Sequence, residues 1–140
     1  MRVIAGRYRG REVKAPKGEM IRPTSDKVKG ALFNMLEPLR DYAVVDFYTG
    51  TGSLGIEALS RGAYQVVFVD KGPEALGLVG ENLSKLKIPI GFQAPAQVLA
   101  LDAAKAFFSL HQEKRTFDLL LADPPYEAGA MRRVQNLLVQ

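Results

Sequence analysis

The 140-residue sequence contains no cysteine and only one histidine, His111. The absence of cysteine excludes a disulfide framework and a thiolate metal site, and a single histidine argues against a histidine-rich metal centre. His111 lies in a polar stretch before residues 112–115, so we expect it at the surface. The composition therefore predicts a protein that works without a bound metal.

Long apolar runs are also missing. No segment reaches the roughly 20 apolar residues of a transmembrane helix, and the arginine-rich N-terminus lacks the apolar core of a secretory signal. We therefore expect a cytoplasmic protein that has no membrane partner. The hydrophobic fraction of 47% is ordinary for a globular protein, and the length suits one packed domain.

The positive charge that is present lies mainly at the N-terminus. Residues 1–29 carry nine Lys or Arg against three acids, a net charge of +6, whereas the remaining residues carry ten against twelve, or −2. Such a basic arm predicts a polyanionic partner, and arginine favours nucleic acid because it binds phosphate in a bidentate manner and stacks on bases. The alternative is a solvated hairpin that binds nothing. The residues assigned to the RNA contact are Arg2, Arg7, Arg9, Arg11, Arg22 and Lys27.

The chain is expected to divide into an arm with a linker, residues 1–23, and a main domain, residues 24–140. In the arm, the strand-like runs 2–5 and 11–15 flank a glycine-bounded turn and predict a β-hairpin. Thr24 or Ser25 can cap the first helix of the domain. The apolar face of that helix, judged from its helical spacing, comprises Val28, Ala31, Leu32 and Met35.

From residue 43 onward, apolar strands alternate with amphipathic helices. The expected strands are 43–47, 65–69, 97–101 and 117–122, with 90–93 as an alternative for the third; the expected helices follow Gly55, begin at Pro73, and cover 103–110 and 128–139. Strands that are apolar throughout, with helices between them, predict an α/β fold whose parallel sheet is covered on both faces.

A glycine-rich turn follows the first strand. Gly50-x-Gly52-x-x-Gly55 matches a dinucleotide-binding pattern, which is weak by itself and also fits an ordinary tight turn. Asp46 distinguishes this site, because a carboxylate there would repel a pyrophosphate but attract a cationic ligand. S-adenosylmethionine carries a sulfonium and an ammonium group, so Asp46 favours it over NAD.

Acids also follow the second and third strands. Asp70 can hold the two hydroxyls of a ribose, which indicates an adenosine ligand without choosing between NAD and S-adenosylmethionine. Asp102 can accept a hydrogen bond from an adenine amino group. The alternatives are a helix-capping role for Asp70 and, as an equal possibility, for Asp102.

The fourth strand ends in Asp123-Pro124-Pro125-Tyr126. Asp123 offers a carboxylate acceptor, the Pro124 carbonyl offers a second acceptor, and Tyr126 offers an aromatic face. Pro125 has no N–H to compete for that carbonyl, and each proline restricts the residue before it. The motif suits a flat ring bearing an amino group. The alternative is a strand end followed by a plain turn.

Four acids thus follow four strands, and the carboxyl ends of parallel strands line one crevice. Such a rim is repulsive unless donors or a cation lie between the acids, and S-adenosylmethionine supplies both. The convergence of Asp46, Asp70, Asp102 and Asp123 is the strongest signal in the sequence.

Several blocks of the sequence match one family. They are residues 2–11, 22–29, 31–34, 46–52, 59–63 and 123–126. The chain resembles class I S-adenosylmethionine-dependent methyltransferases, and more specifically the bacterial 16S ribosomal RNA guanine-N2 methyltransferases of the RsmD type. The resemblance covers nearly the whole chain. The first two blocks are specific to that family, whereas the glycine loop and the Asp123–Tyr126 block are shared with adenine-N6 methyltransferases.

The resemblance implies a Rossmann-like methyltransferase sheet with an N-terminal β-hairpin extension, S-adenosylmethionine as cofactor, and a monomer. It implies methylation of a guanine N2 amine in ribosomal RNA, either naked or within an assembling small subunit. The cofactor residues that it implies are Asp46, Tyr48, Thr49, Gly50, Gly52, Asp70 and Asp102. The catalytic residues that it implies are Asp123, Pro124, Pro125 and Tyr126.

Two features depart from the family pattern. Tyr48-Thr49 stands where the family usually has Phe-Ala, and family members continue for further strands, so the last strands of the sheet are expected to be missing here. Three alternatives stay open: an adenine-N6 methyltransferase acting on DNA or RNA, an NAD oxidoreductase, and a non-catalytic RNA-binding fragment. An NAD oxidoreductase would leave Asp46 and Asp123–Tyr126 unexplained.

Overall fold

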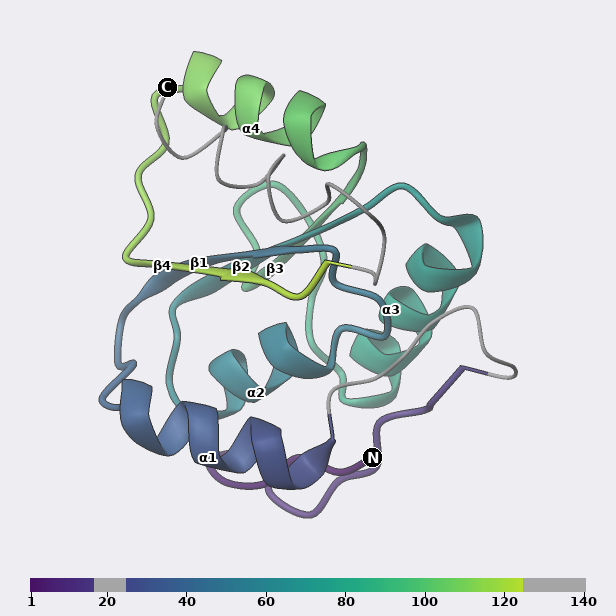
Figure 1. Ribbon diagram of the computed structural model, residues 1–140, viewed down its shortest axis with the longest axis vertical. Coiled ribbons are helices and arrows are strands. Elements are labelled where there is room, and N and C mark those ends of the chain that lie inside the picture. Colours follow the sequence, from purple (N-terminus) through teal and green to yellow (C-terminus); the bar gives the residue numbers. More distant parts are fainter. Residues whose placement is uncertain (17–24, 125–140) are drawn as a thin grey trace.

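The computed structural model describes residues 1–16 and 25–124 (Figure 1). The strands are β1 (Ala43–Phe47), β2 (Gln65–Asp70), β3 (Ala96–Ala100) and β4 (Leu119–Ala122), and the helices are α1 (Asp26–Leu36), α2 (Ser53–Ser60), α3 (Pro73–Lys85) and α4 (Ala103–Gln112). The strands form one parallel sheet in the order β3-β2-β1-β4. The predicted α/β class is confirmed. The third strand lies at the favoured position, and the alternative segment contributes only an isolated Ile90–Ala96 bridge.

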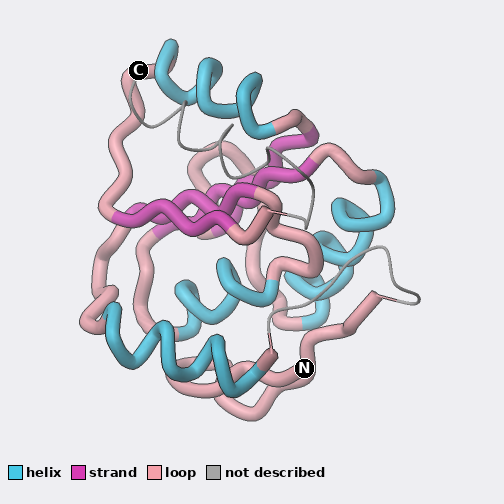
Figure 2. The backbone as a smooth tube through the Cα atoms, viewed as in Figure 1, coloured by secondary structure: helices cyan, strands magenta, loops and turns pink. Residues whose placement is uncertain are grey.

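Helices cover both faces of the sheet, as predicted (Figure 2). On one face, α2 and α3 pack against a cluster that includes Val44, Val66 and Phe68, with α1 outside α2. On the other face, α4 packs against Val45 and Val67. The strands are buried on both sides, which is why their sequences are apolar throughout rather than alternating.

The predicted apolar face of α1 is only partly correct, because Leu32 packs against the core but Val28 and Met35 do not. Val28 is 56% exposed and Met35 is 83% exposed, whereas Lys29, Gly30 and Phe33 form the buried side. The helix begins where predicted, because the Ser25 hydroxyl accepts a hydrogen bond from the Val28 N–H. Apolar spacing missed part of the buried side because that side carries Lys29, whose charge is balanced by Asp26 and Glu57.

The N-terminal arm forms a hairpin, but a minimal one. The turn is predicted correctly, and its paired segments are held by an isolated Arg2–Glu12 bridge and by hydrogen bonds between Val3 and both Arg11 and Gly10. No element longer than this bridge forms within residues 1–16. Val3 and Val13 are buried in the core, and so the arm packs as part of the domain. The boundary predicted at residues 23 and 24 lies outside the described residues.

Backbone groups fix the tip of the arm against the end of α2. The Arg7 N–H donates to the Ser60 carbonyl at 2.7 Å, and the Tyr8 N–H donates to the Ser60 hydroxyl at 2.9 Å. Gly6 has φ +89°, and a Cβ at this position would lie 1.9 Å from the Ser60 carbonyl oxygen. Only glycine permits this approach, since any side chain would collide with backbone.

A buried group of charges joins the arm, α1 and α2. Glu57 and Lys29 are fully buried, and their charged atoms lie 3.7 Å apart. The Lys29 ammonium also donates to the Arg2 carbonyl and the Ser53 hydroxyl, each at 2.8 Å. Arg61 donates to Glu57 at 2.8 Å. This group explains why a lysine occupies the buried side of α1.

Within the described ranges, no helix is long and apolar enough to cross a membrane. His111 is exposed, as predicted. The helix predicted for residues 128–139 lies outside the described residues.

Candidate cofactor and catalytic site

The predicted glycine turn connects β1 to α2 and presents backbone N–H groups at the carboxyl edge of the sheet. Gly50 and Gly52 have φ values of +59° and +84°, which favour glycine at both positions. The Thr49 N–H bonds to the Val69 carbonyl and so anchors the turn to β2. A Cβ on Gly55 would lie 2.3 Å from the Phe68 ring, so this glycine permits close packing of α2 on β2.

Asp46 lies under this turn and is 1% exposed. Its Oδ2 accepts hydrogen bonds from the Thr49 hydroxyl at 2.7 Å and from the Gly55 N–H at 3.1 Å. Its Oδ1 is buried and finds no hydrogen-bond partner among the residues that the structure describes. A buried carboxylate oxygen without a donor is uncommon in folded proteins and indicates an acceptor that awaits a donor or a cation.

Burial raises the pKa of Asp46 to about 7. The hydrogen bonds from Thr49 and Gly55 oppose this increase, while the negative charges of Asp123 and Asp70 add to it. Asp46 therefore changes its ionisation state near neutral pH, and a cation bound beside it would favour the ionised form.

Asp70 ends β2 and faces the same turn. Its Oδ2 accepts from the Gly50 N–H at 3.0 Å, and its Oδ1 accepts from the Gly72 N–H at 2.9 Å. Each carboxylate oxygen has a second acceptor position, so these bonds orient Asp70 and leave it able to bind a diol. Asp70 thereby links the glycine turn after β1 to the start of α3.

The other two predicted acids lie on either side of this pair. Asp102 caps α4 by accepting a hydrogen bond from the Lys105 N–H at 2.8 Å, which is the capping alternative considered for it. Asp123 directly follows β4, whose last residue, Ala122, pairs with Phe47 of β1. The structure thus brings the four acids to one edge of the sheet. The strand order reverses between the neighbouring strands β1 and β4, which is where parallel α/β sheets commonly bind ligands. Pro125 and Tyr126 lie outside the described residues.

The residues present at this edge fit S-adenosylmethionine. Asp46 has an unsatisfied buried carboxylate oxygen, which suits a cationic group, and the hydrogen-bonded Asp70 carboxylate keeps acceptor positions that suit a ribose. The glycines leave room for a ligand beside the backbone. Tyr48, with φ +58°, is half-buried in the turn.

The predicted RNA-binding residues that the structure describes lie on separate segments. Arg7 and Arg9 lie at the tip of the arm, which is held against the end of α2. The Arg11 guanidinium donates to the Lys85 carbonyl at the end of α3. Arg2 and Lys27 lie nearer the start of α1, where the Arg2 N–H bonds to the Asp26 carboxylate. Arg22 is outside the described residues.

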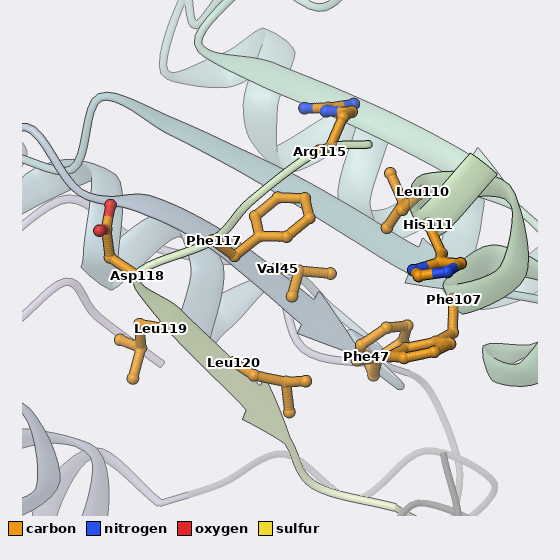
Figure 3. A pocket seen from close by; sticks show the side chains of 10 residues that line it. All are labelled: Val45, Phe47, Phe107, Leu110, His111, Arg115, Phe117, Asp118, Leu119 and Leu120. Carbon is orange, nitrogen blue, oxygen red and sulfur yellow. The ribbon is translucent and has the colours of Figure 1, made fainter. Parts of the chain in front are cut away.

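A separate hollow of about 380 Å³ lies between α4 and the β1–β4 side of the sheet (Figure 3). Its lining is mainly apolar and includes Val45, Phe107 and Leu120. None of the predicted site residues within the described ranges lines it, and it lies on one face of the sheet rather than at the carboxyl edge. We therefore do not assign the cofactor to this hollow.

Sequence reasoning missed the roles of Lys29, Glu57 and Arg61. A signal for two of them was present, because Glu57 interrupts an apolar helix and Arg61 follows it by one turn, the spacing of a helical ion pair. Thr49, which the family resemblance assigns to the cofactor, donates its hydroxyl to Asp46 in the structure.

Comparison with known proteins gives the family. The model of the family described as "Conserved hypothetical protein 95" matches residues 1–140. The chain belongs to this family. One family relative is the "Putative rRNA methyltransferase YlbH" of Bacillus subtilis, which is 39% identical over 139 residues, with 99% of this chain and 73% of that protein covered.

Other relatives of this chain carry similar names. The "Ribosomal RNA small subunit methyltransferase D" of Haemophilus influenzae is 34% identical, with 100% of this chain and 71% of that protein covered. Among solved structures, the "Putative methyltransferase yhhF from Escherichia coli" superposes with a TM-score of 0.80 at 33% identity, with 100% of this chain and 72% of that chain covered. The chain therefore corresponds to about seven tenths of these relatives.

Proposed function

We propose that the chain transfers a methyl group from S-adenosylmethionine to an exocyclic amine of a base in small-subunit ribosomal RNA, with guanine N2 as the target. The observation that carries the proposal is the buried, incompletely satisfied Asp46 carboxylate at a glycine turn, next to the strand that presents Asp123 and Pro124. The names of the relatives support ribosomal RNA as the substrate. With that substrate, we place the activity in the cytoplasm.

The glycine turn and its two acids form the cofactor side of the site. S-adenosylmethionine, when bound, supplies an electrophilic methyl group on a sulfonium. Asp46 offers its unpartnered oxygen to a cationic group, and Asp70 offers its remaining acceptor positions to the ribose hydroxyls. Tyr48, Thr49, Gly50 and Gly52 shape the turn around this ligand, and Asp102, already a helix cap, can accept from the adenine amine.

The Asp123–Tyr126 motif forms the substrate side. An exocyclic amine is a weak nucleophile because its lone pair is delocalised into the ring. Two acceptors, the Asp123 carboxylate and the Pro124 carbonyl, would hold its two N–H groups and favour a more tetrahedral nitrogen. Most of the acceleration then comes from orientation and a preorganised field, and the amine proton can leave after transfer. Pro125 fixes the carbonyl, and Tyr126 stacks on a base that is flipped out or already unpaired.

The decisive experiment measures transfer of radiolabelled methyl groups to small-subunit ribosomal RNA, naked and within assembled particles, followed by nucleoside analysis. We expect N2-methylguanosine from the wild-type chain. Asp123→Ala should abolish transfer and leave the affinity for S-adenosylmethionine nearly unchanged. Glu113→Ala is the matched control, since it removes an exposed acid at the end of α4, far from the carboxyl edge. Retained turnover in Asp123→Ala would refute the assignment.

The same experiment separates the competing functions. Recovery of N6-methyladenosine would identify an adenine-N6 methyltransferase, which shares the catalytic block. RNA binding without cofactor binding would identify a non-catalytic fragment. Calorimetric titration with NAD tests the oxidoreductase alternative, for which Asp46 and Asp123 have no role.

A further inference from the structure

A hollow of about 330 Å³ lies at the edge of the sheet opposite the four acids. It is formed where the chain enters the strands: Tyr64 precedes β2, Pro95 precedes β3, and Asp41 lies just before β1. The tip of the arm closes one side with Arg7 and Tyr8. The remaining lining residues are Leu59, Gly62, Ala63, Lys87, Ile88 and Pro89.

The rim of this hollow combines positive charge with aromatic rings. Arg7 and Lys87 are exposed, and Tyr64, just before β2, is 69% exposed. The Arg7 guanidinium lies 5.4 Å from the centre of the Tyr8 ring. Asp41 is the one acid among the described residues that line the hollow.

Further basic residues surround this rim. The Arg11 guanidinium donates to the Lys85 carbonyl, and so Arg11 lies beside the end of α3. Arg40 lies against Gly62, where an added Cβ would be 3.4 Å from the Arg40 Cα. The side chains of Arg11, Arg40 and Lys85 are all exposed. The edge therefore presents positive charge from three segments that are remote in sequence.

This combination suits single-stranded nucleic acid. Exposed aromatic rings provide stacking platforms for bases, and arginine and lysine beside them bind the phosphates that connect those bases. An acidic protein partner could pair with the positive charges, but it would not account for the exposed ring of Tyr64. The arm is also preorganised for the contact, because Ser60 already fixes the backbone of Arg7 and Tyr8.

We propose that this basic aromatic edge, defined by Arg7, Tyr8, Tyr64 and Lys87, binds a second, unpaired segment of the RNA substrate. The proposal rests on the function proposed above. Strands of five or six residues separate the two edges by about 17–20 Å, so the segment held here is not the one that places its base beside Asp123. One RNA must bend around the domain or contact it at two places.

The test compares affinities for small-subunit ribosomal RNA between two variants and their matched controls. Tyr64→Ala removes the ring, and the double variant Arg7→Glu/Lys87→Glu reverses the charges. Phe108→Ala and Lys105→Glu are the controls, because they change a 62%-exposed ring and an exposed lysine on α4. Thermal unfolding and the affinity for S-adenosylmethionine, measured on all variants, verify that the fold and the cofactor site are intact.

We expect Tyr64→Ala to weaken RNA binding roughly fivefold or more, which is the effect of losing one stacked base. The double variant should reduce the slope of log affinity against log salt concentration by about 2, one unit per lost phosphate contact. Both variants should raise KM for the RNA and leave kcat unchanged, and the controls should match the wild type. Crosslinks from thiouridine-substituted RNA to the peptide containing Tyr64 would support the proposal further.

Three results overturn the proposal: variants that bind RNA like the wild type, a salt slope that does not change, or crosslinks from thiouridine-substituted RNA that reach other peptides of the chain but not the peptide containing Tyr64. The outcomes also separate the two proposals. A wild type that methylates RNA, together with unaffected variants, removes only the second contact. A wild type that binds RNA through this edge but transfers no methyl group removes only the proposed activity.

Discussion

Two carboxylates of this molecule, Glu57 and Asp46, are buried and have opposite surroundings. Glu57 accepts hydrogen bonds from the N–H groups of Ile4 and Ala5 and from Arg61, and it lies 3.7 Å from the Lys29 ammonium. Asp46 accepts only from Thr49 and Gly55, and its second oxygen has no partner within the described chain.

The neighbouring charges also differ between the two carboxylates, and they too favour the charged form of Glu57 over that of Asp46. Glu57 is surrounded by cations, whereas Asp46 has Asp70 and Asp123 as its charged neighbours. A buried charge with every acceptor position used stabilises one arrangement of the chain, since removing either partner leaves the other uncompensated. A buried charge that is incompletely satisfied costs free energy in the empty protein, and that free energy is recovered when a cationic ligand binds. We infer from this difference a structural role for Glu57, and the difference supports the binding role proposed for Asp46.

The largest effect should follow from removing Glu57, whose two carboxylate oxygens both accept hydrogen bonds. Glu57→Ala leaves two buried cations and two backbone N–H groups without their acceptor, so we expect the free energy of unfolding to fall by about 3–5 kcal/mol. Urea unfolding measures the loss. Glu74→Ala, which removes an exposed glutamate from the first turn of α3, is the control and should change stability by less than about 0.5 kcal/mol. An equal, small effect in both variants would contradict the structural role of Glu57.

The arm supplies two of the donors to Glu57, so its docking can be tested separately. Gly6→Ala places a Cβ against the Ser60 carbonyl and should destabilise the protein by roughly 3 kcal/mol or more. Gly10→Ala is a matched control: Gly10 also has a positive φ, +82°, but a Cβ there meets nothing within 4 Å. It should lose only about 1–2 kcal/mol from backbone strain. Equal losses in the two variants would show that the arm is not packed against α2.

Removing the charge of Asp46 should reduce ligand affinity rather than stability. We expect Asp46→Asn to weaken binding of S-adenosylmethionine at least tenfold, or about 1.4 kcal/mol, while stability at neutral pH is kept or increased. Calorimetric titration and urea unfolding on the same preparations measure the two quantities. A variant that unfolds but retains its ligand affinity would reverse the roles assigned to Asp46 and Glu57.

Asp46 also predicts a pH dependence of stability. Its folded pKa of about 7 lies above the ordinary value of 3.8, so the folded state binds more protons than the unfolded state between these values. The free energy of unfolding should therefore fall by a few kcal/mol as pH rises from 4 to 7, apart from the contributions of other groups. The difference between wild type and Asp46→Asn isolates this part. Ligand affinity should rise over the same range, since binding of a cation favours the ionised carboxylate.

The smallest effect should come from Thr49. Its hydroxyl donates to Asp46 at 2.7 Å and opposes the increase in the pKa of that carboxylate. Thr49→Ala should move the pH midpoint of ligand binding upward by less than about one unit, and Thr49→Ser should restore it. Titrations at a series of pH values measure the midpoint. A uniform loss of affinity at every pH would instead indicate direct contact between Thr49 and the ligand.

The parallel sheet, and the edge at which the acids meet, follow from the order of residues along the chain. Near-continuous apolar strands can be buried only between two layers of helices, and parallel strands necessarily present their carboxyl ends on one side. Asp46, Asp70, Asp102 and Asp123 could therefore be grouped from the sequence alone. The glycine turn followed from the same local pattern, because its conformation depends on neighbouring residues.

Only packing in three dimensions determined which groups pair with the buried charges and where the arginines of the arm lie. The apolar spacing placed Val28 and Met35 on the buried face of α1, but that face carries Lys29 instead. The Lys29 ammonium can be buried because it pairs with Glu57 and donates to the Arg2 carbonyl. The Ile4 N–H and its acceptor on Glu57 are 53 residues apart, and no local pattern relates them. Hydrogen bonding and ion pairing act through space, so their partners are fixed by packing and not by position along the chain.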